Sequence, residues 1–422
     1  MNEYCLAVYR IYDDKADFHK KAEGIAVGLT VGSWTDLPEA RKEEMQKHLG
    51  RVVSVDIYDE AGTERYADIA IAYPDVNFSR DIPALLVTVF GKLSMDGKVK
   101  LMDLKFSQRF MSAFNGPKFG LPGVRKLLGV QDRPLLMSIF KSVIGHDLEA
   151  LQEQFYQQAL GGVDLIKDDE ILFENPLTPI ERRVEACMKA ARLAEQETGQ
   201  KLLYAVNLTG PTSNLAAQAK KAIDAGANAL LFNVLAYGFD TLHELASNPE
   251  ISVPIAAHPA MAGAMYPSPH YGISAKVLLG KLMRLAGADL VLFPSPYGSV
   301  VMPKDENLAI REVLLTEDVP NNYLFSLSAV PSAELHLKPS VPVPSAGIHP
   351  GLVPWIIRDF GTDVVVNAGG GVHGHPMGAA AGGRAFRQAI DAVLSSMTLT
   401  TYAEQPQNAE LAAAIQAWGV KQ

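Results

Sequence analysis

Cysteine is scarce in this sequence, with only Cys5 and Cys187 among 422 residues. Two cysteines do not build a disulfide framework, so a reducing compartment, the cytoplasm, is the expected location. The first residues lack the basic and then apolar segments of a secretory signal, and no apolar run reaches the roughly 20 residues that cross a bilayer. The sequence therefore indicates neither export nor membrane association.

Positive charge is also in short supply. The chain has 38 Lys and Arg against 47 Asp and Glu, for a formal net charge of −9, and it contains no basic run. Nucleic-acid backbones require clustered Lys and Arg, so we expect no nucleic-acid partner. A small phosphorylated ligand, which needs only local positive charge, stays compatible. The 48% hydrophobic and 20% charged residues are typical of globular proteins, and the length suffices for two domains.

Between residues 133 and 394 short apolar, β-rich runs alternate with segments of helical character. The helical segments include 148–160, 179–197 with Thr178 as the expected N-cap, and 376–394. Repeated β–α alternation also fits a doubly wound sheet. Eight units with functional-looking residues at nearly every strand end favour an α/β fold with a (β/α)₈ TIM barrel. The eight runs are 134–141, 163–169, 202–208, 229–234, 253–258, 290–294, 341–345 and 364–368.

The sequence before residue 125 has a different pattern. Segments 6–12, 52–58 and 66–73 alternate like strands, and 17–27 is helical in character, which indicates a small α+β domain. From residue 404 the chain is polar. We therefore expect an N-terminal α+β domain at residues 1–125, a barrel at 126–403, and a C-terminal tail or terminal helix at 404–422.

The most informative segment is 161–170, where an apolar run ends in Lys167, Asp168, Asp169 and Glu170. The carboxyl ends of barrel strands open onto the active site. Asp169 and Glu170 offer the hard oxygen ligands that Mg²⁺ prefers, but two carboxylates seldom complete its octahedral shell. Lys167 either pairs with these acids or reacts with CO₂ to form an anionic carbamate that also binds metal. A buried ion-pair cluster is the competing interpretation.

A glycine run, Gly369-Gly370-Gly371, directly follows the last strand. Without side chains, such a backbone approaches an anion closely and aims N–H groups at it. Glycine runs are often only turns. After the eighth strand of a barrel, where phosphate sites recur, this one predicts a phosphate cradle together with Gly347 and Ser345.

Five stretches in register resemble the ribulose bisphosphate carboxylase (RuBisCO) superfamily. The resemblance implies that Lys167 is carbamylated by CO₂ and that this carbamate, Asp169 and Glu170 hold Mg²⁺. It also implies a ferredoxin-like N-terminal domain and a homodimer whose active site lies at the subunit interface. The stretches are 133–141, 161–170, Ala256-Ala257-His258-Pro259-Ala260-Met261, Ser345-Ala346-Gly347-Ile348-His349 and Gly369-Gly370-Gly371-Val372-His373-Gly374-His375-Pro376.

Two further residues are assigned to substrate binding through this resemblance. Trp34, in Gly32-Ser33-Trp34-Thr35, is placed where the family has a threonine-tryptophan pair that reaches into the neighbouring site. Taken alone, Trp34 fits packing better than binding. His258 is a candidate to hydrogen bond substrate oxygens, and a satisfied core histidine is an equally good interpretation.

Departures from the carboxylases are equally informative. Residues 293–301, after the sixth strand, contain no lysine at the family's CO₂-orienting position, and Lys304 is out of register. Val143, Pro259 and Gly28 stand where the family has a lysine, an arginine and an acid. The missing arginine removes part of the second phosphate site. We therefore expect a ligand with one phosphate and no carboxylase activity.

Lys92 falls where carboxylases place an active-site asparagine. A lysine in such a position acts as a general base when its pKa is lowered toward neutrality; without the resemblance it is a surface lysine at a helix end. With Lys141 as a second catalytic lysine, the pattern resembles the RuBisCO-like proteins of methionine salvage, specifically the 2,3-diketo-5-methylthiopentyl-1-phosphate enolases. Two alternatives stay open: another RuBisCO-like isomerase acting on a methylthio-sugar phosphate, and a non-catalytic binding protein.

Overall fold

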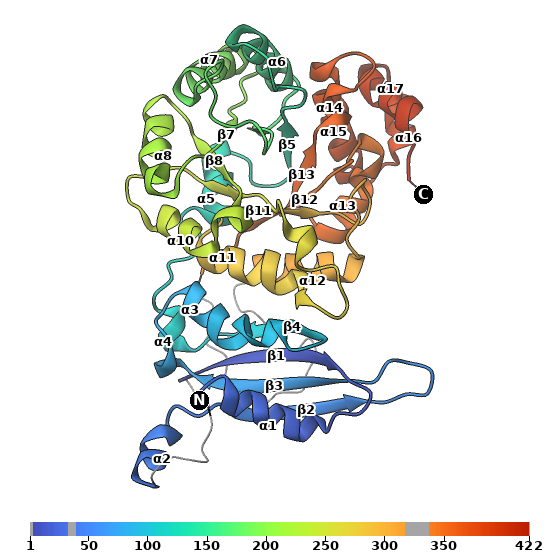
Figure 1. Cartoon of the computed structure of the whole chain (residues 1–422). Helices are drawn as coiled ribbons and strands as arrows, with labels where there is room; N and C mark the ends of the chain where they lie inside the picture. The colour runs from blue at the N-terminus through green and yellow to red at the C-terminus, as the bar shows by residue number, and fades with distance from the viewer. Residues whose placement is uncertain (1–2, 33–38, 317–336, 422) are drawn as a thin grey trace.

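An antiparallel sheet with helices on one face forms the N-terminal domain. The computed structural model describes residues 3–32, 39–316 and 337–421 (Figure 1). The sheet order β4-β1-β3-β2, with antiparallel pairs throughout, is that of a ferredoxin-like domain and confirms the expected fold. The elements are β1 (Tyr4–Tyr12), α1 (Phe18–Gly28), α2 (Glu39–Gln46), β2 (Arg51–Tyr58), β3 (Tyr66–Pro74), α3 (Ile82–Leu86), β4 (Val99–Lys105) and α4 (Gln108–Met111).

Strand β1 shows why this sheet has one buried face. Its odd-numbered residues from Cys5 to Ile11 are apolar and join the main core beneath the helices. Leu6 and Val8 point to the opposite face, where they form a small separate cluster with Ala70. This alternation follows from the two-residue period of a strand. Asp17 caps the N-terminus of α1 by accepting a hydrogen bond from Lys20 N.

The C-terminal domain is a parallel barrel, and all eight expected strands are confirmed within the described residues. Strands β12 and β13 lie at the two ends of the hydrogen-bonded order, and Asn367 Nδ2 bridges this seam to Ser345 Oγ at 2.8 Å. The strands are β5 (Leu135–Ile139), β6 (Leu165–Lys167), β7 (Leu203–Asn207), β8 (Ala229–Phe232), β9 (Ile255–Ala257), β11 (Leu290–Pro294), β12 (Val341–Ser345) and β13 (Val365–Ala368).

Apolar side chains fill the barrel interior. Each of the eight strands contributes to one buried cluster, which includes Leu165, Leu203 and Val343. Helix α5 (Gly120–Leu128) closes the amino-terminal end with Val124 and Leu128. The interior is thus a packed core, and the polar residues gather at the carboxyl ends of the strands, where barrel active sites lie.

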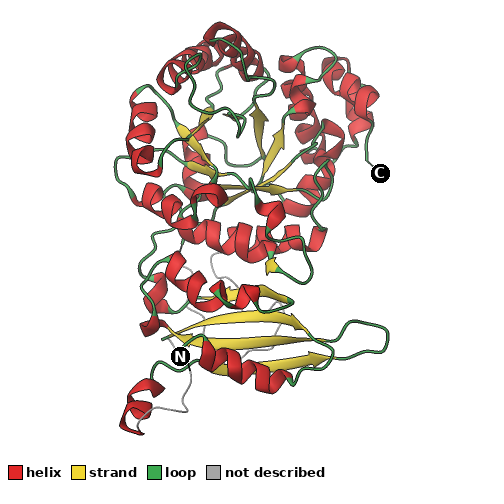
Figure 2. Ribbon diagram, viewed as in Figure 1, coloured by secondary structure: helices red, strands yellow, loops and turns green. Residues whose placement is uncertain are grey.

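Helices surround the barrel (Figure 2). They are α6 (Leu148–Leu160), α7 (Ile180–Thr198), α8 (Leu215–Asp224), α9 (Val234–Tyr237), α10 (Phe239–Ser247), α11 (Leu282–Ala286), α12 (Lys304–Leu315), α13 (Val353–Phe360), α14 (Gly370–His373), α15 (Ala379–Leu394), α16 (Leu399–Ala403) and α17 (Ala409–Trp418). Helix α17 packs on α15, where Glu410 accepts from Arg384 and Gln388. No helix in the described ranges is long and apolar enough to cross a membrane.

Two expected helix starts were wrong. Thr178 is not the N-cap of α7: Pro179 holds that position, and the amide of Ile180 donates to Glu174 Oε2 at 3.1 Å. The Thr178 hydroxyl instead bonds Asn175. The segment that begins at 376 becomes helical only at Ala379, because Gly378 adopts φ +91°, which is outside the helical region.

The N-terminal domain is joined firmly to the flank of its own barrel. In Figure 1 its sheet lies next to α11 and α12. The short strand β10 (Gly272–Ile273), which leaves the barrel after β9, adds to the sheet by pairing in parallel with β4. Asp103 on β4 accepts from Lys276 and Lys281, each at 2.7 Å. The domain is therefore held beside the barrel rather than over the mouth of its own barrel.

Candidate active site

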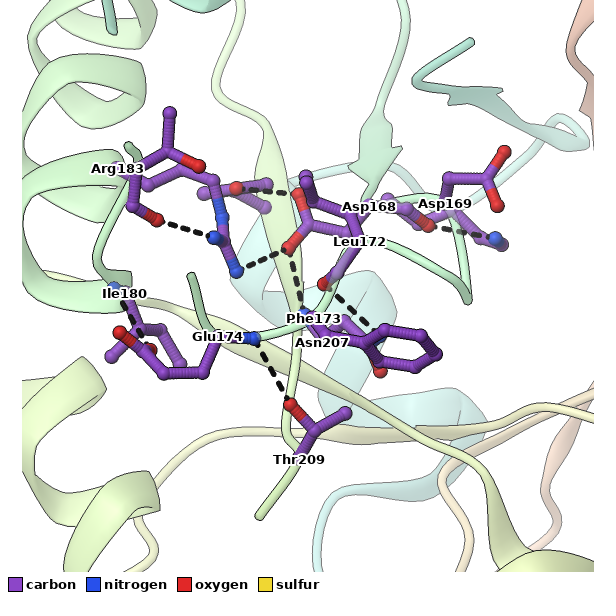
Figure 3. Close-up of polar contacts among 12 residues, drawn as sticks. Asp168, Asp169, Leu172, Phe173, Glu174, Ile180, Arg183, Asn207 and Thr209 are labelled. Atoms are coloured by element: carbon purple, nitrogen blue, oxygen red, sulfur yellow. Dashed lines mark hydrogen bonds and ion pairs between the residues drawn. The ribbon is translucent and has the colours of Figure 1, made fainter. Parts of the chain in front are cut away.

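The end of β6 delivers three polar side chains in alternating directions. Lys167 points into the barrel and is 0% exposed, and its Nζ donates to the carbonyl of Asp168 at 2.8 Å. Asp168 points the other way, into the layer between barrel and helices, and Asp169 returns to the mouth. Figure 3 shows the carboxylates of Asp168 and Asp169 directed apart. The two-residue period of a strand thus separates a site-facing pair from Asp168.

The structure brings together five of the residues expected in the site. Asp169 Oδ2 accepts from Lys141 Nζ at 2.9 Å, at the end of β5. Glu170 Oε2 lies 3.5 Å from Lys167 Nζ and 3.4 Å from His258 Nε2, which follows β9. Strands β5, β6 and β9 therefore converge on one cluster of alternating charge at the carboxyl end of the barrel.

Burial sets the protonation tendencies of this cluster. It lowers the pKa of the Lys167 amine, against the opposing attraction of Glu170 and Asp169. A lowered pKa favours the neutral amine, the form that attacks CO₂. Burial acts to raise the pKa of Glu170, but the charges of Lys167 and Lys141 outweigh it, so the pKa of Glu170 is held below its usual value.

His258 is neutral, and its tautomer follows from its contacts. The amide of Ala260 donates to Nδ1 at 3.2 Å, so the ring proton is on Nε2, which faces Glu170. Burial, with the nearby charge of Lys167, lowers the pKa of His258 to about 3. The imidazole is therefore a hydrogen-bond donor to the site at neutral pH, not a cation.

The depressed pKa of His258 predicts a pH effect on stability. From pH 6.5 down to about 3, unfolded His258 takes up a proton that the folded chain does not. The metal-free protein should therefore lose stability relative to a His258→Gln variant as pH falls, by at most about 3 kcal/mol near pH 4. Urea unfolding of both proteins at several pH values measures this difference; a constant difference between pH 7 and pH 4 would contradict it.

The residues of the expected phosphate cradle lie at or just beyond the carboxyl ends of the neighbouring strands β12 and β13. The first turn of α14 carries the amides of Gly370 and Gly371, and N–H groups at a helix start have no intrahelical acceptor. A Cβ on Gly369 would come within 2.9 Å of Lys141 Cε, so this turn adjoins the cluster. Gly347 has φ +66°, and a Cβ there would come within 2.5 Å of Ser299 N. The Ser345 hydroxyl donates to Val343 O and accepts from Asn367.

Of the expected site residues that the structure describes, Lys92 lies apart from this cluster. Lys92 is exposed on the N-terminal domain, just after a π-helical turn at Val87–Gly91 that continues α3. Trp34 lies outside the described residues. Within one chain, the barrel mouth therefore lacks the lysine expected to act as the base.

Sequence reasoning missed the residues that hold the β6 end in place. Asn207 Nδ2 donates to the carbonyls of Glu170 and Leu172, at 3.0 and 3.2 Å, and Asn233 Nδ2 donates to Glu170 O at 3.3 Å. The available signal was their position: Asn207 ends β7 and Asn233 directly follows β8, at the same carboxyl end of the barrel at which Lys167 ends β6. Both are buried.

The carboxylates of the cluster do not by themselves complete a metal site. In the part of the chain that the structure describes, no group of three His, Cys, Asp or Glu side chains is arranged to hold one. Asp169 and Glu170 supply two carboxylates on adjacent residues, and the buried amine of Lys167 lies beside Glu170. A third anionic ligand must therefore come from a modified Lys167, and the residues present fit a divalent cation on that condition.

Comparison with known proteins agrees with this geometry over nearly the whole chain. The family models for the ribulose bisphosphate carboxylase large chain match, the N-terminal domain over residues 2–110 and the catalytic domain over residues 120–418. Proteins named 2,3-diketo-5-methylthiopentyl-1-phosphate enolase from Bacillus licheniformis and Geobacillus kaustophilus are 54% and 52% identical, each match covering 98% of both chains.

Solved structures show the same relationship. A rubisco-like protein (MtnW) from Alicyclobacillus acidocaldarius has a TM-score of 0.89 at 48% identity and covers 99% of this chain and 100% of its own. The dimeric archaeal Rubisco from Hyperthermus butylicus has a TM-score of 0.88 at 30% identity and covers 100% and 97%. The chain therefore belongs to the ribulose bisphosphate carboxylase large-chain family and, within it, is a RuBisCO-like protein similar to the named enolases.

Proposed function

We propose that this protein is a 2,3-diketo-5-methylthiopentyl-1-phosphate enolase, a keto-enol tautomerase of methionine salvage. It would convert the diketone to 2-hydroxy-3-keto-5-methylthiopentenyl-1-phosphate. The observation that supports this most is the cluster of Lys141, Lys167, Asp169 and Glu170 beside a glycine turn, in a chain 54% identical to a protein with that name. Cys5 and Cys187 are free and buried, which suits the cytoplasm as its location.

The proposed metal ligands are a carbamate on Lys167 with Asp169 and Glu170. Burial favours the neutral amine of Lys167, which CO₂ requires, and the two neighbouring carboxylates complete an all-oxygen set of the kind Mg²⁺ takes. Once bound, Mg²⁺ would polarise the substrate carbonyls and acidify the adjacent C–H bond. In this arrangement Lys141 is freed from Asp169, since that carboxylate turns to the metal.

The proposed acid–base residues lie on both sides of the substrate. Lys92 removes the proton from C1, and the charge that develops on the C2 carbonyl oxygen is stabilised by donors facing the site; protonation of that oxygen then gives the enol. His258 Nε2–H is one such donor. Lys141 is the other, because its stem lies against Gly369, between the carboxylates and the glycine turn.

The phosphate would be held on the β12–β13 side. Amides of Gly370 and Gly371, and the backbone at Gly347, present N–H groups on a surface without side chains. Gly371 has a second reason to lack a Cβ, which would lie 2.3 Å from Ile348 O. The Ser345 hydroxyl, at the seam between these strands, would complete the proposed cradle by turning its proton from Val343 O to the phosphate.

Carboxylation is not expected from this site. Lys304, the lysine nearest to the loop after β11, is held at the start of α12, where its Nζ contacts Asp359 Oδ1 at 3.0 Å. The Lys304 amine is therefore paired with Asp359 and is not directed at the barrel mouth. Pro259 follows His258 without a positive charge for a second phosphate. These two features support an enolase acting on a substrate with one phosphate.

We also propose a homodimer in which Lys92 enters the barrel mouth of the partner subunit. Lys92 is flanked by exposed apolar side chains, with Val87 70% and Met95 79% exposed. The barrel mouth has apolar residues of its own, including Phe173 and Met261. Exposed apolar surface of this kind indicates an interface. The dimeric archaeal Rubisco supports the same assembly.

Mixed dimers test the shared site. Lys92→Ala and Lys167→Ala should each be inactive alone, but co-refolded in equal amounts they should recover about a quarter of wild-type activity, because half of the dimers are mixed and each has one intact site. The activity of the mixture, with each variant alone as control, measures this. If Lys92 served its own barrel, every site in the mixture would lack one lysine and no activity would return.

Substrate discrimination tests the function itself. Purified protein with Mg²⁺ and bicarbonate should form the enol from 2,3-diketo-5-methylthiopentyl-1-phosphate, followed by ³¹P and proton NMR. The same protein should incorporate no labelled CO₂ into acid-stable product from ribulose 1,5-bisphosphate. Carbon fixation, or turnover of a methylthio-sugar phosphate in place of the diketone, would contradict the proposal.

A further inference from the structure

Asp168 stands between two proposed metal ligands yet faces away from the metal site. Its side chain is 0% exposed and lies in the layer between the barrel and α7. Oδ1 accepts from the Tyr204 hydroxyl at 2.6 Å, and Oδ2 accepts from the amide of Asn207 at 2.9 Å and lies 3.3 Å from Arg183 Nη2 (Figure 3). Two groups from β7 and one from α7 therefore converge on the carboxylate of Asp168.

Stability of the fold does not explain a buried ion pair at this position. The layer around it is otherwise apolar and aromatic, with Phe140, Phe155 and Tyr204 in mutual contact. Taking a carboxylate and a guanidinium out of water is costly, and well-packed apolar residues are often as stable or more stable. The ion pair of Asp168 and Arg183 is better explained by the backbone segments that it holds in place.

Asp168 belongs to a set of contacts that encloses the ligand-bearing backbone. It fixes the amide of Asn207, and the Asn207 side chain returns to the carbonyls of Glu170 and Leu172. On the other side, Arg183 Nη1 donates to Thr178 O at 2.8 Å, at the end of the loop that leaves Glu170. The backbone of 169–172 is thus tied to β7 directly and to α7 through Asp168.

We propose that Asp168, together with Arg183 and Asn207, is a positioning device that sets the backbone of Asp169 and Glu170 so that both carboxylates converge on one cation. The inference rests on the proposed function only for the identity of the metal ligands. Asp168 touches neither metal nor substrate in this account. Its effect is transmitted through the backbone and through Asn207, so loss of Asp168 should weaken metal binding in a protein that still folds.

Asp164 offers a matched control on the same strand segment. It is 3% exposed, accepts from both Nη atoms of Arg133 at 2.9 Å, and accepts from the amide of Leu136 at 2.8 Å. It lies at the opposite end of β6 from the site. Asp164→Asn therefore removes a comparable buried charge with no connection to the ligand segment.

The experiment is a Mn²⁺ titration with bicarbonate present, followed by the electron paramagnetic resonance signal of free Mn²⁺, with Tm measured in parallel. Asp168→Asn should raise the Mn²⁺ Kd by about 10–100-fold, the range seen when groups that orient metal ligands are removed. The double variant Asp168→Leu with Arg183→Met, which leaves no unpaired charge, should do the same. Asp164→Asn should lower Tm without changing the Kd.

Each outcome decides the inference. A Kd unchanged from wild type in folded Asp168→Asn would overturn it, as would an equal loss of affinity in Asp164→Asn. If the double variant does not fold, Asp168→Asn decides alone. Wild-type protein that binds no Mn²⁺ with bicarbonate would overturn both this inference and the proposed metal site. Wild-type protein that binds Mn²⁺ but does not turn over the diketone overturns only the proposed function.

Discussion

Replacing Lys92 with alanine is expected to lower the rate of proton exchange at C1 of the diketone by about 10²–10⁴-fold, the usual contribution of a general base. Lys92 is the one proposed catalytic group that the fold places on the N-terminal domain, exposed and flanked by apolar side chains. No other proposed residue removes a proton from carbon. Substrate affinity should change little, because the phosphate and carbonyl contacts come from the barrel.

The measurement is C1 deuteration by proton NMR at saturating substrate, with Mn²⁺ affinity determined separately. Lys98→Ala is the matched control, since Lys98 is also on the N-terminal domain but forms a salt bridge with Glu64. It should exchange at the wild-type rate. Retained exchange in Lys92→Ala would move the base elsewhere and favour a different acid–base set, such as that of a sugar-phosphate isomerase.

Replacing Lys167 with alanine should have the largest effect, because it removes the carbamate and with it the third anionic ligand. Losing the metal forfeits several kcal/mol of charge stabilisation, which corresponds to a fall in turnover of at least about 10³-fold. Bicarbonate should no longer increase Mn²⁺ affinity. With ¹³C-bicarbonate, the carbamate carbonyl signal of the wild-type protein should be missing from the variant.

Lys189→Ala serves as the control, because Lys189 is exposed on α7 outside the site. It should keep the carbamate signal, the metal affinity and the turnover. A carbamate signal that survives in Lys167→Ala would place the modification on another lysine. Metal binding that does not depend on bicarbonate in the wild type would contradict the carbamate altogether.

Local pattern was enough to predict the barrel and the position of Lys167, Asp169 and Glu170 at the end of one of its strands. Apolar runs with polar ends recur because each parallel strand is buried along its length and ends at the site, as β6 does at Lys167. The two-residue period of its strands predicted a small α+β N-terminal domain, whereas the ferredoxin-like arrangement of that domain was implied only by the family resemblance. Helix starts were less predictable: Thr178 has the right chemistry for an N-cap, but α7 begins after Pro179, and the amide of Ile180 donates to Glu174.

Other parts of the site depend on contacts that no local pattern contains. The alternation of β6 implies that Asp168 faces outward, but its partners come from α7 and β7, 15 or more residues away in sequence, and are brought together by the fold. The position of Lys92 was harder still to predict, because the structure places this residue on the flank of its own barrel. Its proposed role requires a second subunit, which one sequence does not display.

The most direct test of the account is proton NMR of the purified protein with 2,3-diketo-5-methylthiopentyl-1-phosphate, Mg²⁺ and bicarbonate in D₂O. We expect deuteration at C1 together with appearance of the enol, and loss of both when the metal is removed with a chelator. Neither deuteration nor enol formation in the presence of Mg²⁺ would contradict the enolase proposal while leaving the family and the fold unchanged.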